Sequence, residues 1–391
     1  MKILFISYDA VSLGAFSIRV RALICSLARR GHEITLVTAV KVAETDEINK
    51  YCVRLFSIPS RFREGPARIY HRIVSLPDPA GPWAREIIED PRILGLKADT
   101  DLIFISSPPH GIQEAGMVLH SKWGTPYIAD LRDDWVGNHR TRFLTPLHKH
   151  RARELELRMV QEATLILANT RQMREQFIAR HPAAGEKVVV LTNGFNESEF
   201  NGLASDGCRS VRARVGYVGS GYGGFVSRVL SGMARQWISQ NQQAQWQISA
   251  YMGSGTPFSG IPSELLGQFP FLTPIESAAK MNECDVLLLL MPPGERVPSP
   301  TVPLKTYSYL RTGLPIVYCG EQGATTELLE KFEGTFCLPR CAGAELAEFF
   351  IANRNMWTRR YPRKDIARYS FESLGIDLEQ HLCGVLNCHR K

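Results

Sequence analysis

The sequence predicts an α/β protein built from two doubly wound, parallel-sheet domains that face a central cleft. Short apolar runs of strand length alternate with helical stretches, which is typical of a parallel sheet covered on both faces. The alternation stops at a polar stretch, residues 196–212, and then starts again. The chain has 391 residues, which is long for one core and suits two domains of similar size.

The first domain is predicted to span residues 1–200. We expect a helix at 17–30, where Gly31 supplies the left-handed residue that commonly ends a helix, and a second helix at 113–122. Strands are expected at the apolar runs 2–7, 33–39, 101–106, 126–130, 165–169 and 188–191.

The second domain is predicted to span residues 201–365. Residues 366–391 are predicted to form a helical tail, with its helix at 377–386, that packs back on the first domain. Strands of the second domain are expected at 215–218, 247–251, 286–290 and 315–319, and helices at 225–240, 276–282, 303–312 and 324–332.

Composition places the chain among ordinary globular proteins, with 44% hydrophobic and 22% charged residues. No apolar run approaches the roughly 20 residues of a membrane span. The first residues lack the longer apolar region of a signal peptide, so we expect a cytoplasmic protein. The nine cysteines are odd in number and form no C-x-x-C motif, which predicts reduced thiols. A metal site at Cys337 and Cys341 with a distant histidine is the alternative, but the spacing of a second ligand pair is missing.

The formal net charge is +7, which suits an anionic partner such as a nucleotide or a phospholipid surface. Nucleic acid ranks last among such partners, because neither a nucleic-acid motif nor aromatic residues interleaved with basic ones occur.

In parallel sheets ligands bind beyond the carboxyl ends of the strands, so the loops there are the places to look for chemistry. Gly14 lies in the loop after the first strand, where backbone N–H groups of the next helix point into the cleft. An ordinary strand-to-helix turn is the alternative for this loop.

A second glycine loop follows the strand at 215–218 and formally reads G-x-G-x-x-G. A nicotinamide site would need an acidic residue at the end of the next strand, and residues 247–251 contain none. We therefore interpret the loop as a phosphate cradle, with a plain tight turn as the alternative. The candidate donor-binding residues here are Gly219, Ser220, Gly221, Gly223 and Arg228.

A third anion-binding candidate is the start of the helix at 303–312. Pro303 suits a first helical turn, and Gly313 with Pro315 ends the helix. Lys305 beside the helix N-terminus makes a candidate anion site, for which an ordinary surface lysine is the alternative.

Five segments in a fixed order carry a family resemblance across most of the chain. They are the Gly14 loop with residues 28–35, then 106–110, 130–135, 169–170 with 191–196, and 302–315. With these segments the sequence resembles the retaining GT-B glycosyltransferases of family 4, especially a bacterial branch that makes cell-surface polysaccharides.

The resemblance implies two Rossmann-like domains, with a nucleotide-diphosphate sugar bound to the second and the acceptor bound to the first. It implies no cofactor and no required metal, because helix N-termini and basic side chains stabilise the leaving diphosphate. It also implies front-face attack with retention of configuration. The acceptor would be a lipid-linked or oligosaccharide hydroxyl.

Two departures from the family pattern concern the chemistry. The family usually has two glutamates eight residues apart, and Pro300 and Ser308 occupy those positions here. Ser308 offers one hydrogen bond without charge, and Glu295 or Glu327 are candidates to replace the first acid.

The second departure is that Arg132 stands near the position where many relatives have a histidine. A base for the acceptor hydroxyl is still needed, unless the leaving phosphate serves. Asp130, Asp133 and His110 are candidates, and each has a salt bridge or loop cap as the alternative role. We predict that Asp130, Arg132 and His110 form the catalytic group.

Basic residues gather in 139–158, and Arg68 and Arg72 flank an apolar stripe formed by Ile69, Ile73 and Leu76. Such surfaces predict peripheral contact with an anionic membrane at the inner face of the cytoplasmic membrane. An amphipathic core helix with a solvated outer face is the alternative.

Three rival functions stay open beside sugar transfer. One is a glycosyltransferase-like binding or scaffold protein that lost turnover with its two glutamates. Another is a sugar-nucleotide epimerase on the same architecture. A nicotinamide oxidoreductase is disfavoured by the missing acid after Ala250.

Overall fold

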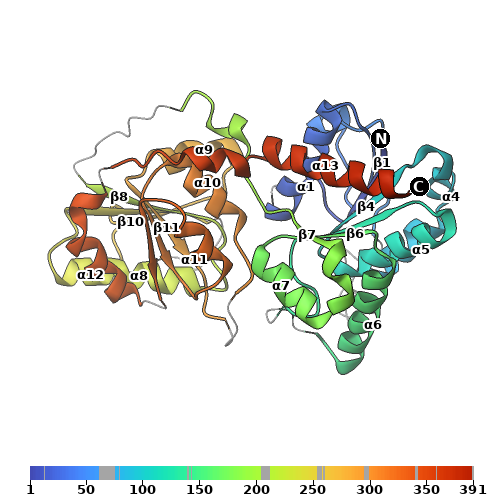
Figure 1. Ribbon diagram of the computed structural model, residues 1–391. Helices are drawn as coiled ribbons and strands as arrows, with labels where there is room; N and C mark the ends of the chain where they lie inside the picture. The colour runs from blue at the N-terminus through green and yellow to red at the C-terminus, as the bar shows by residue number, and fades with distance from the viewer. Residues whose placement is uncertain are drawn as a thin grey trace. The chain divides into compact units, whose positions relative to one another are not determined.

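The computed structural model describes the chain except for residues 13, 61–74, 79, 139–140, 142, 204–211, 253–257, 259, 295–298, 340–341, 358 and 390–391. It divides into two compact units. Unit 1 comprises Met1–Asn193 together with Phe371–Lys391, and unit 2 comprises Gly194–Ser370. Each unit has a wholly parallel sheet, which confirms the predicted fold class of two doubly wound α/β domains (Figure 1).

Unit 1 contains a seven-stranded sheet in the order β3-β2-β1-β4-β5-β6-β7. Its strands are β1 (Lys2–Ser7), β2 (Glu33–Thr38), β3 (Arg54–Ser57), β4 (Leu102–Ser107), β5 (Tyr127–Leu131), β6 (Leu165–Ala168) and β7 (Val188–Val190). Its α-helices are α1 (Ala15–Arg29), α3 (Gly81–Glu89), α4 (Pro91–Leu94), α5 (Gln113–Trp123), α6 (Pro146–Glu162), α7 (Arg171–Arg180) and α13 (Phe371–His389), and its short 3₁₀ helices are Glu47–Lys50, Lys97–Asp99, His110–Ile112 and Pro182–Lys187.

Strands β1, β4 and β5 are buried along almost their whole length, because helices cover both faces of the sheet. On one face, helices α3, α5, α6 and α7 pack through a core that includes Trp83, Met117, Leu155 and Phe177. On the other side of unit 1, α1 packs against the C-terminal helix α13. This contact is close, because a Cβ built on Gly375 of α13 would lie 1.9 Å from the hydroxyl oxygen of Ser26.

Unit 2 contains a six-stranded sheet in the order β10-β9-β8-β11-β12-β13. Its strands are β8 (Ala213–Val218), β9 (Trp246–Tyr251), β10 (Leu266–Phe269), β11 (Val286–Leu290), β12 (Ile316–Cys319) and β13 (Thr335–Leu338). Its α-helices are α8 (Phe225–Ser239), α9 (Pro274–Asn282), α10 (Leu304–Thr312), α11 (Ala324–Leu329) and α12 (Gly343–Ala352), and its 3₁₀ helices are Glu197–Phe200, Arg354–Met356 and Lys364–Tyr369.

Alternate residues of the central strand β11 enter two different cores of unit 2. Leu288 and Leu290 pack with α8 and α12, whereas Leu287 and Leu289 pack with α9, α10 and α11. Figure 1 shows the pair α8 and α12 on one side of this sheet and the pair α9 and α10 on the other. Because both faces are covered, the loops at the strand ends are the parts left to contact a ligand.

The cysteines and the helices bear on the expected reduced thiols, on the alternative metal site and on membrane spans. The described cysteines are free thiols, and Cys208 and Cys341 lie outside the described residues, so the alternative metal site at Cys337 and Cys341 is only partly described. The described residues contain no group of three His, Cys, Asp or Glu side chains that could hold a metal ion. None of the helices described here is both long and apolar enough to cross a membrane.

Candidate functional site

Candidate residues of unit 1 gather where β4 and β5 end, side by side in the sheet. Asp130 is the fourth residue of β5, and Ser106 and Ser107 close β4. His110 follows at once in a short 3₁₀ helix, and Arg132 comes directly after β5. The structure thus brings the three predicted catalytic residues, Asp130, Arg132 and His110, to the carboxyl ends of two neighbouring strands.

Asp130 is fully buried and its two carboxylate oxygens both have partners. One oxygen accepts a hydrogen bond from Arg19 Nη2 at 2.9 Å, and the other accepts one from the Ser106 hydroxyl at 2.6 Å. Hydrogen bonds from a charged guanidinium and from a hydroxyl therefore hold the carboxylate in place. The geometry therefore supports the alternative role of Asp130, a satisfied ion pair.

Arg19 is the buried charged residue at these strand ends that the sequence analysis missed. It lies in α1, only 1% exposed. Its guanidinium also donates to the carbonyl oxygens of Leu191, at 3.0 Å, and of Thr192. The signal was present in the sequence, because Arg19 shares one helical face with Leu23 and Leu27, four and eight residues further on. An arginine on an apolar stripe needs a buried acid, and Asp130 is that acid.

Arg132 braces the loop after β4 with its side chain. Its Nε donates to the carbonyl of Ser107 at 3.1 Å, and its Nη2 donates to the carbonyl of Pro108. Burial lowers the pKa of Arg132 to about 10, so the guanidinium keeps its charge at neutral pH. Asn169, the residue directly after β6, donates a 2.9 Å hydrogen bond from Nδ2 to the Arg132 carbonyl. Arg132 therefore supplies fixed positive charge.

His110 is buried against the ring of Trp135, with centroids 5.2 Å apart and planes inclined by 16°. Its Nδ1 lies 3.0 Å from the hydroxyl oxygen of Ser107. Burial, and then the nearby positive charge of Arg132, lower the pKa of His110 to about 3. The imidazole is therefore neutral throughout the physiological pH range.

Gly14 lies at the N-cap of α1, where its carbonyl accepts from the N–H groups of Ser17 and Ile18 at 3.0 and 3.1 Å. Its φ is −74°, and a Cβ built there would touch only the hydroxyl of Ser12, at 3.4 Å. The fold therefore does not require glycine at this position. A close approach by a ligand stays a prediction.

In unit 2 the glycine loop follows β8 and begins α8. Gly219, Gly223 and Gly224 have φ values of 139°, 61° and 86°, and Tyr222 between them has φ 46°. Positive φ favours glycine and strains a tyrosine, so the loop has an unusual backbone. The carbonyl of Ser220 accepts a 2.6 Å hydrogen bond from the Tyr217 hydroxyl, which fixes the loop to β8.

Lys305, in the first turn of α10, reaches under this loop. Its Nζ is buried and has no hydrogen-bond partner among the described residues. A Cβ built on Gly219 would lie 2.8 Å from that Nζ, so a larger residue at 219 would force the ammonium to move. The ammonium lies 4.1 Å from the centroid of the Tyr217 ring and 5.7 Å from that of Tyr222.

Burial alone lowers the pKa of Lys305 to about 7. A buried lysine without a carboxylate partner is costly for the fold. An anion would satisfy it, and the N–H groups at the start of α10 would add their dipole. The structure therefore brings the predicted cradle and Lys305 together.

Other predicted donor-binding residues lie around this centre. Gly221 approaches Met252, because a Cβ built on it would lie 3.1 Å from the Met252 methyl carbon. Arg228 is exposed in the first turn of α8, with Nη1 3.8 Å from a Cβ built on Gly224. Ser308 is half-buried one turn after Lys305 on α10, and Pro300 is buried before that helix. Glu295 lies outside the described residues.

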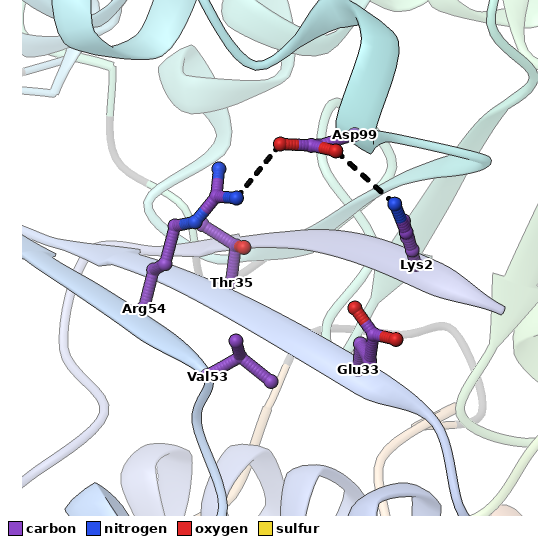
Figure 2. A pocket seen from close by; sticks show the side chains of 6 residues that line it. All are labelled: Lys2, Glu33, Thr35, Val53, Arg54 and Asp99. Atoms are coloured by element: carbon purple, nitrogen blue, oxygen red, sulfur yellow. Dashed lines mark hydrogen bonds and ion pairs between the residues drawn. The ribbon is translucent and has the colours of Figure 1, made fainter.

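A small hollow elsewhere in unit 1 does not touch any of these residues (Figure 2). It lies at the amino ends of β1 and β2 and beside β3, where Asp99 forms ion pairs with Lys2 and Arg54 at 3.1 and 2.7 Å. Its volume of about 20 Å³ is enough for a water molecule only. Its lining lies at the amino ends of the strands, whereas the candidate site lies at their carboxyl ends.

Comparisons with known proteins bear on the fold of the chain. Residues 14–194 match the family described as "Glycosyl transferase 4-like domain". Sucrose-phosphate synthase from Thermosynechococcus elongatus superposes with a TM-score of 0.69 at 15% identity, covering 99% of both chains. Anabaena HepE in complex with UDP and glucose gives 0.65 at 13% identity, covering 98% of this chain and 99% of HepE.

The chain has the GT-B fold, with a family 4-like first domain. WaaG, a glycosyltransferase involved in lipopolysaccharide biosynthesis, is a further GT-B neighbour, with a TM-score of 0.60 at 13% identity over 97% of this chain and 95% of WaaG. No curated protein matches the chain. The family match lies in unit 1, and the candidate anion site of this GT-B protein lies in unit 2.

Proposed function

We propose that this GT-B protein is a glycosyltransferase that moves a sugar from a nucleoside-diphosphate donor to an acceptor hydroxyl. The observation that carries the proposal is the buried ammonium of Lys305 beneath the glycine loop, and this ammonium has no hydrogen-bond partner in the part of the chain that the structure describes. A diphosphate would satisfy that ammonium and accept from N–H groups of the loop together. The crystal structure of HepE with UDP and glucose makes UDP the first nucleotide to test.

In the proposed reaction the acceptor oxygen attacks the anomeric carbon of the sugar on the face that the diphosphate leaves. The glycosidic C–O bond to the acceptor forms as the C–O bond to phosphate breaks. Asp130 is already bound to Arg19 and Ser106, so the acceptor proton passes to the leaving phosphate oxygen. The product keeps the anomeric configuration, and a nucleoside diphosphate leaves.

We propose that this step needs neither cofactor nor metal. The ammonium of Lys305, the exposed Arg228 and the N-termini of α8 and α10 supply positive charge where the leaving diphosphate develops its charge. Transfer should therefore continue unchanged in the presence of a chelator. A loss of transfer that Mg²⁺ restores would contradict this part of the proposal.

The acceptor is proposed to be lipid-linked or an oligosaccharide, as needed for a bacterial cell-surface or secreted polysaccharide, at the inner face of the cytoplasmic membrane. The region around α6 supports this, because Leu147 and Leu157 are exposed by 59% and 51%, and Lys149 and Arg153 are exposed on the same helix. Basic and apolar side chains together suit an anionic lipid surface. Arg68, Arg72, Arg140 and Arg142 lie outside the described residues.

The membrane part is tested by flotation with vesicles of anionic and of neutral lipid. Leu147→Glu and Lys149→Glu should each reduce binding to the anionic vesicles. Glu89→Gln, an exposed change on α3, is the matched control. No flotation with the anionic vesicles, even at low salt, would remove the membrane contact.

The donor site is tested by calorimetric titration of UDP and by transfer from UDP-sugars with cell-extract acceptors. Lys305→Met should weaken UDP binding by tenfold or more, since a charge-assisted contact contributes about 1.5–3 kcal/mol. Lys331→Met, an exposed lysine of the same unit, is the control. Equal UDP affinity in Lys305→Met and the control would remove Lys305 from the site.

Pro300 and Ser308 favour one rival, a binding or scaffold protein without turnover, because neither side chain offers a carboxylate to the donor ribose. This rival predicts UDP binding without transfer to any acceptor. The epimerase rival predicts that the donor sugar is changed in the absence of an acceptor. The same assay therefore separates all three functions.

A further inference from the structure

A chain of buried hydrogen bonds leads to the imidazole of His110 in unit 1. The Tyr127 hydroxyl donates to Gln113 Oε1, and Gln113 Nε2 donates to the Ser107 hydroxyl oxygen at 2.8 Å. Ser107 in turn lies 3.0 Å from His110 Nδ1. All four side chains are buried, so water does not compete along the chain.

The direction of these bonds follows from the groups that can only donate or only accept. Gln113 Nε2 also faces the carbonyl oxygen of Ile105 at 3.5 Å. A carbonyl oxygen repels the amide oxygen and attracts the NH₂ group, so this neighbour favours the orientation in which Nε2 donates to Ser107. The oxygen end then accepts from Tyr127, whose pKa burial raises well above its ordinary value, so the phenol keeps its proton.

Ser107 has one hydroxyl hydrogen and two acceptors within reach. Its oxygen lies 3.0 Å from His110 Nδ1 and 3.4 Å from the Asp130 carbonyl. The shorter distance is the ordinary one for a hydrogen bond, and the longer one is beyond the usual range for a hydroxyl donor. Because Gln113 already donates to Ser107, the hydroxyl hydrogen is free to point at Nδ1.

We propose that Gln113 is a positioning residue that, through Ser107, holds His110 as the tautomer with its proton on Nε2. His110 then presents an N–H donor to an oxygen of the substrate, and it is not the base that takes the acceptor proton. The proposed tautomer rests on these hydrogen-bond distances, whereas the substrate contact rests on the proposed sugar transfer.

The tautomer is read from long-range ¹H–¹⁵N correlation spectra of the full chain labelled with ¹⁵N-histidine. The chain has ten histidines, and the difference from the His110→Gln spectrum assigns the signals. We expect a protonated Nε2 and an unprotonated Nδ1 for His110 across about pH 5 to 8, the range in which free histidine titrates. A protonated Nδ1 in the wild type overturns the proposal.

Gln113→Glu is the sharpest variant, because it keeps the shape but replaces the donor with a carboxylate. Ser107 should then donate to the introduced carboxylate, and His110 should change to the tautomer with its proton on Nδ1. If the spectrum of this variant keeps the wild-type tautomer, Gln113 does not position His110. Should the carboxylate prevent folding, Ser107→Ala decides the same question, with a mixture of both tautomers expected.

Activity provides a second readout. Gln113→Glu should lower kcat by about tenfold, the effect of one lost hydrogen bond to the reacting complex, and leave UDP affinity unchanged, because Gln113 lies in unit 1 and the proposed cradle in unit 2. His110→Gln, which keeps an N–H donor, should retain more activity than His110→Ala. Equal activity in those two variants overturns the donor role. Absence of any transfer by the wild type refutes the proposed function instead, and the spectra still decide the tautomer.

Discussion

The ammonium of Lys305 lies 4.1 Å from the centre of the Tyr217 ring. It also lies 2.8 Å from the place that a Cβ of residue 219 would occupy. The contact joins the first turn of α10 to the end of β8. A cation over an aromatic face gains some electrostatic stabilisation. That contact does not replace the hydrogen bonds that an ammonium can donate. This lysine therefore has more to gain from an anion than an exposed lysine has.

Nucleotide binding should depend on pH above neutrality. The pKa of Lys305 in the free protein is about 7, so alkaline solution removes the charge that attracts a diphosphate, and binding must then take up a proton. UDP affinity should fall by on the order of tenfold per pH unit above pH 7. Titration calorimetry in two buffers with different ionisation enthalpies measures both the affinity and the proton uptake.

The matched variant in that experiment is Lys305→Met, which keeps the length and removes the titrating group. Its residual UDP affinity should be flat over the same pH range, and the proton uptake should vanish. A wild-type affinity that stays constant from pH 7 to pH 9 would contradict this prediction.

The free energy of unfolding should also depend on pH through the titration of Lys305. The pKa of Lys305 in the folded state is lowered to about 7 from 10.5, so between these values the unfolded chain binds more protons. The free energy of unfolding therefore gains up to about 1.4 kcal/mol per pH unit as pH rises through this window. Denaturant unfolding curves measured near pH 7 and near pH 10.5 should show this gain in the wild type. The gain should be absent in Lys305→Met.

The glycine loop offers a graded pair of substitutions. Gly219→Ala combines a φ of 139° with a Cβ 2.8 Å from Lys305 Nζ, whereas Gly223→Ala has a φ of 61° and open space. We expect Gly223→Ala to cost about 1 kcal/mol of stability from the backbone alone. Gly219→Ala should cost more and should also displace Lys305, so it should weaken UDP binding. Thermal melts and UDP titration of the two variants check this order.

The buried pair Arg19 and Asp130 should be far more sensitive to substitution than an exposed ion pair. Asp130→Ala leaves the guanidinium of Arg19 buried without its counter-charge, which costs about 3–5 kcal/mol. Thermal denaturation should show a large loss, and the exposed change Glu89→Gln should show none. A melting temperature near the wild-type value in Asp130→Ala would mean that Arg19 is not held as described.

The interior strands of both sheets were predictable from the sequence, but three of the four edge strands were not. Strands such as β1 and β11 are buried on both faces, so their sequences are continuous apolar runs. Strands β3, β10 and β13 lie at sheet edges and are only partly buried. Their sequences mix polar and apolar residues, and no strand was predicted at any of the three.

The candidate site shows the same division. Local patterns were enough to single out the glycine loop after β8, Lys305 at the start of α10 and Asp130 near the end of β5. The partner of Asp130 could not be identified, because Arg19 is 111 residues away in the chain and only the fold brings the two together. The aromatic surroundings of Lys305 were equally hidden, since Tyr217 reads as an ordinary strand residue.

The C-terminal helix α13 belongs to unit 1, although all of unit 2 lies between it and the rest of that unit in the chain. During translation the ribosome must therefore finish unit 2 before it makes the last helix of unit 1. Until then the face of α1 that receives Gly375 stays uncovered, and Arg30 and His32 lack their partner Glu379. A nascent chain that stalls inside unit 2 consequently carries an unfinished first unit, which chaperones would recognise by the exposed surface of α1.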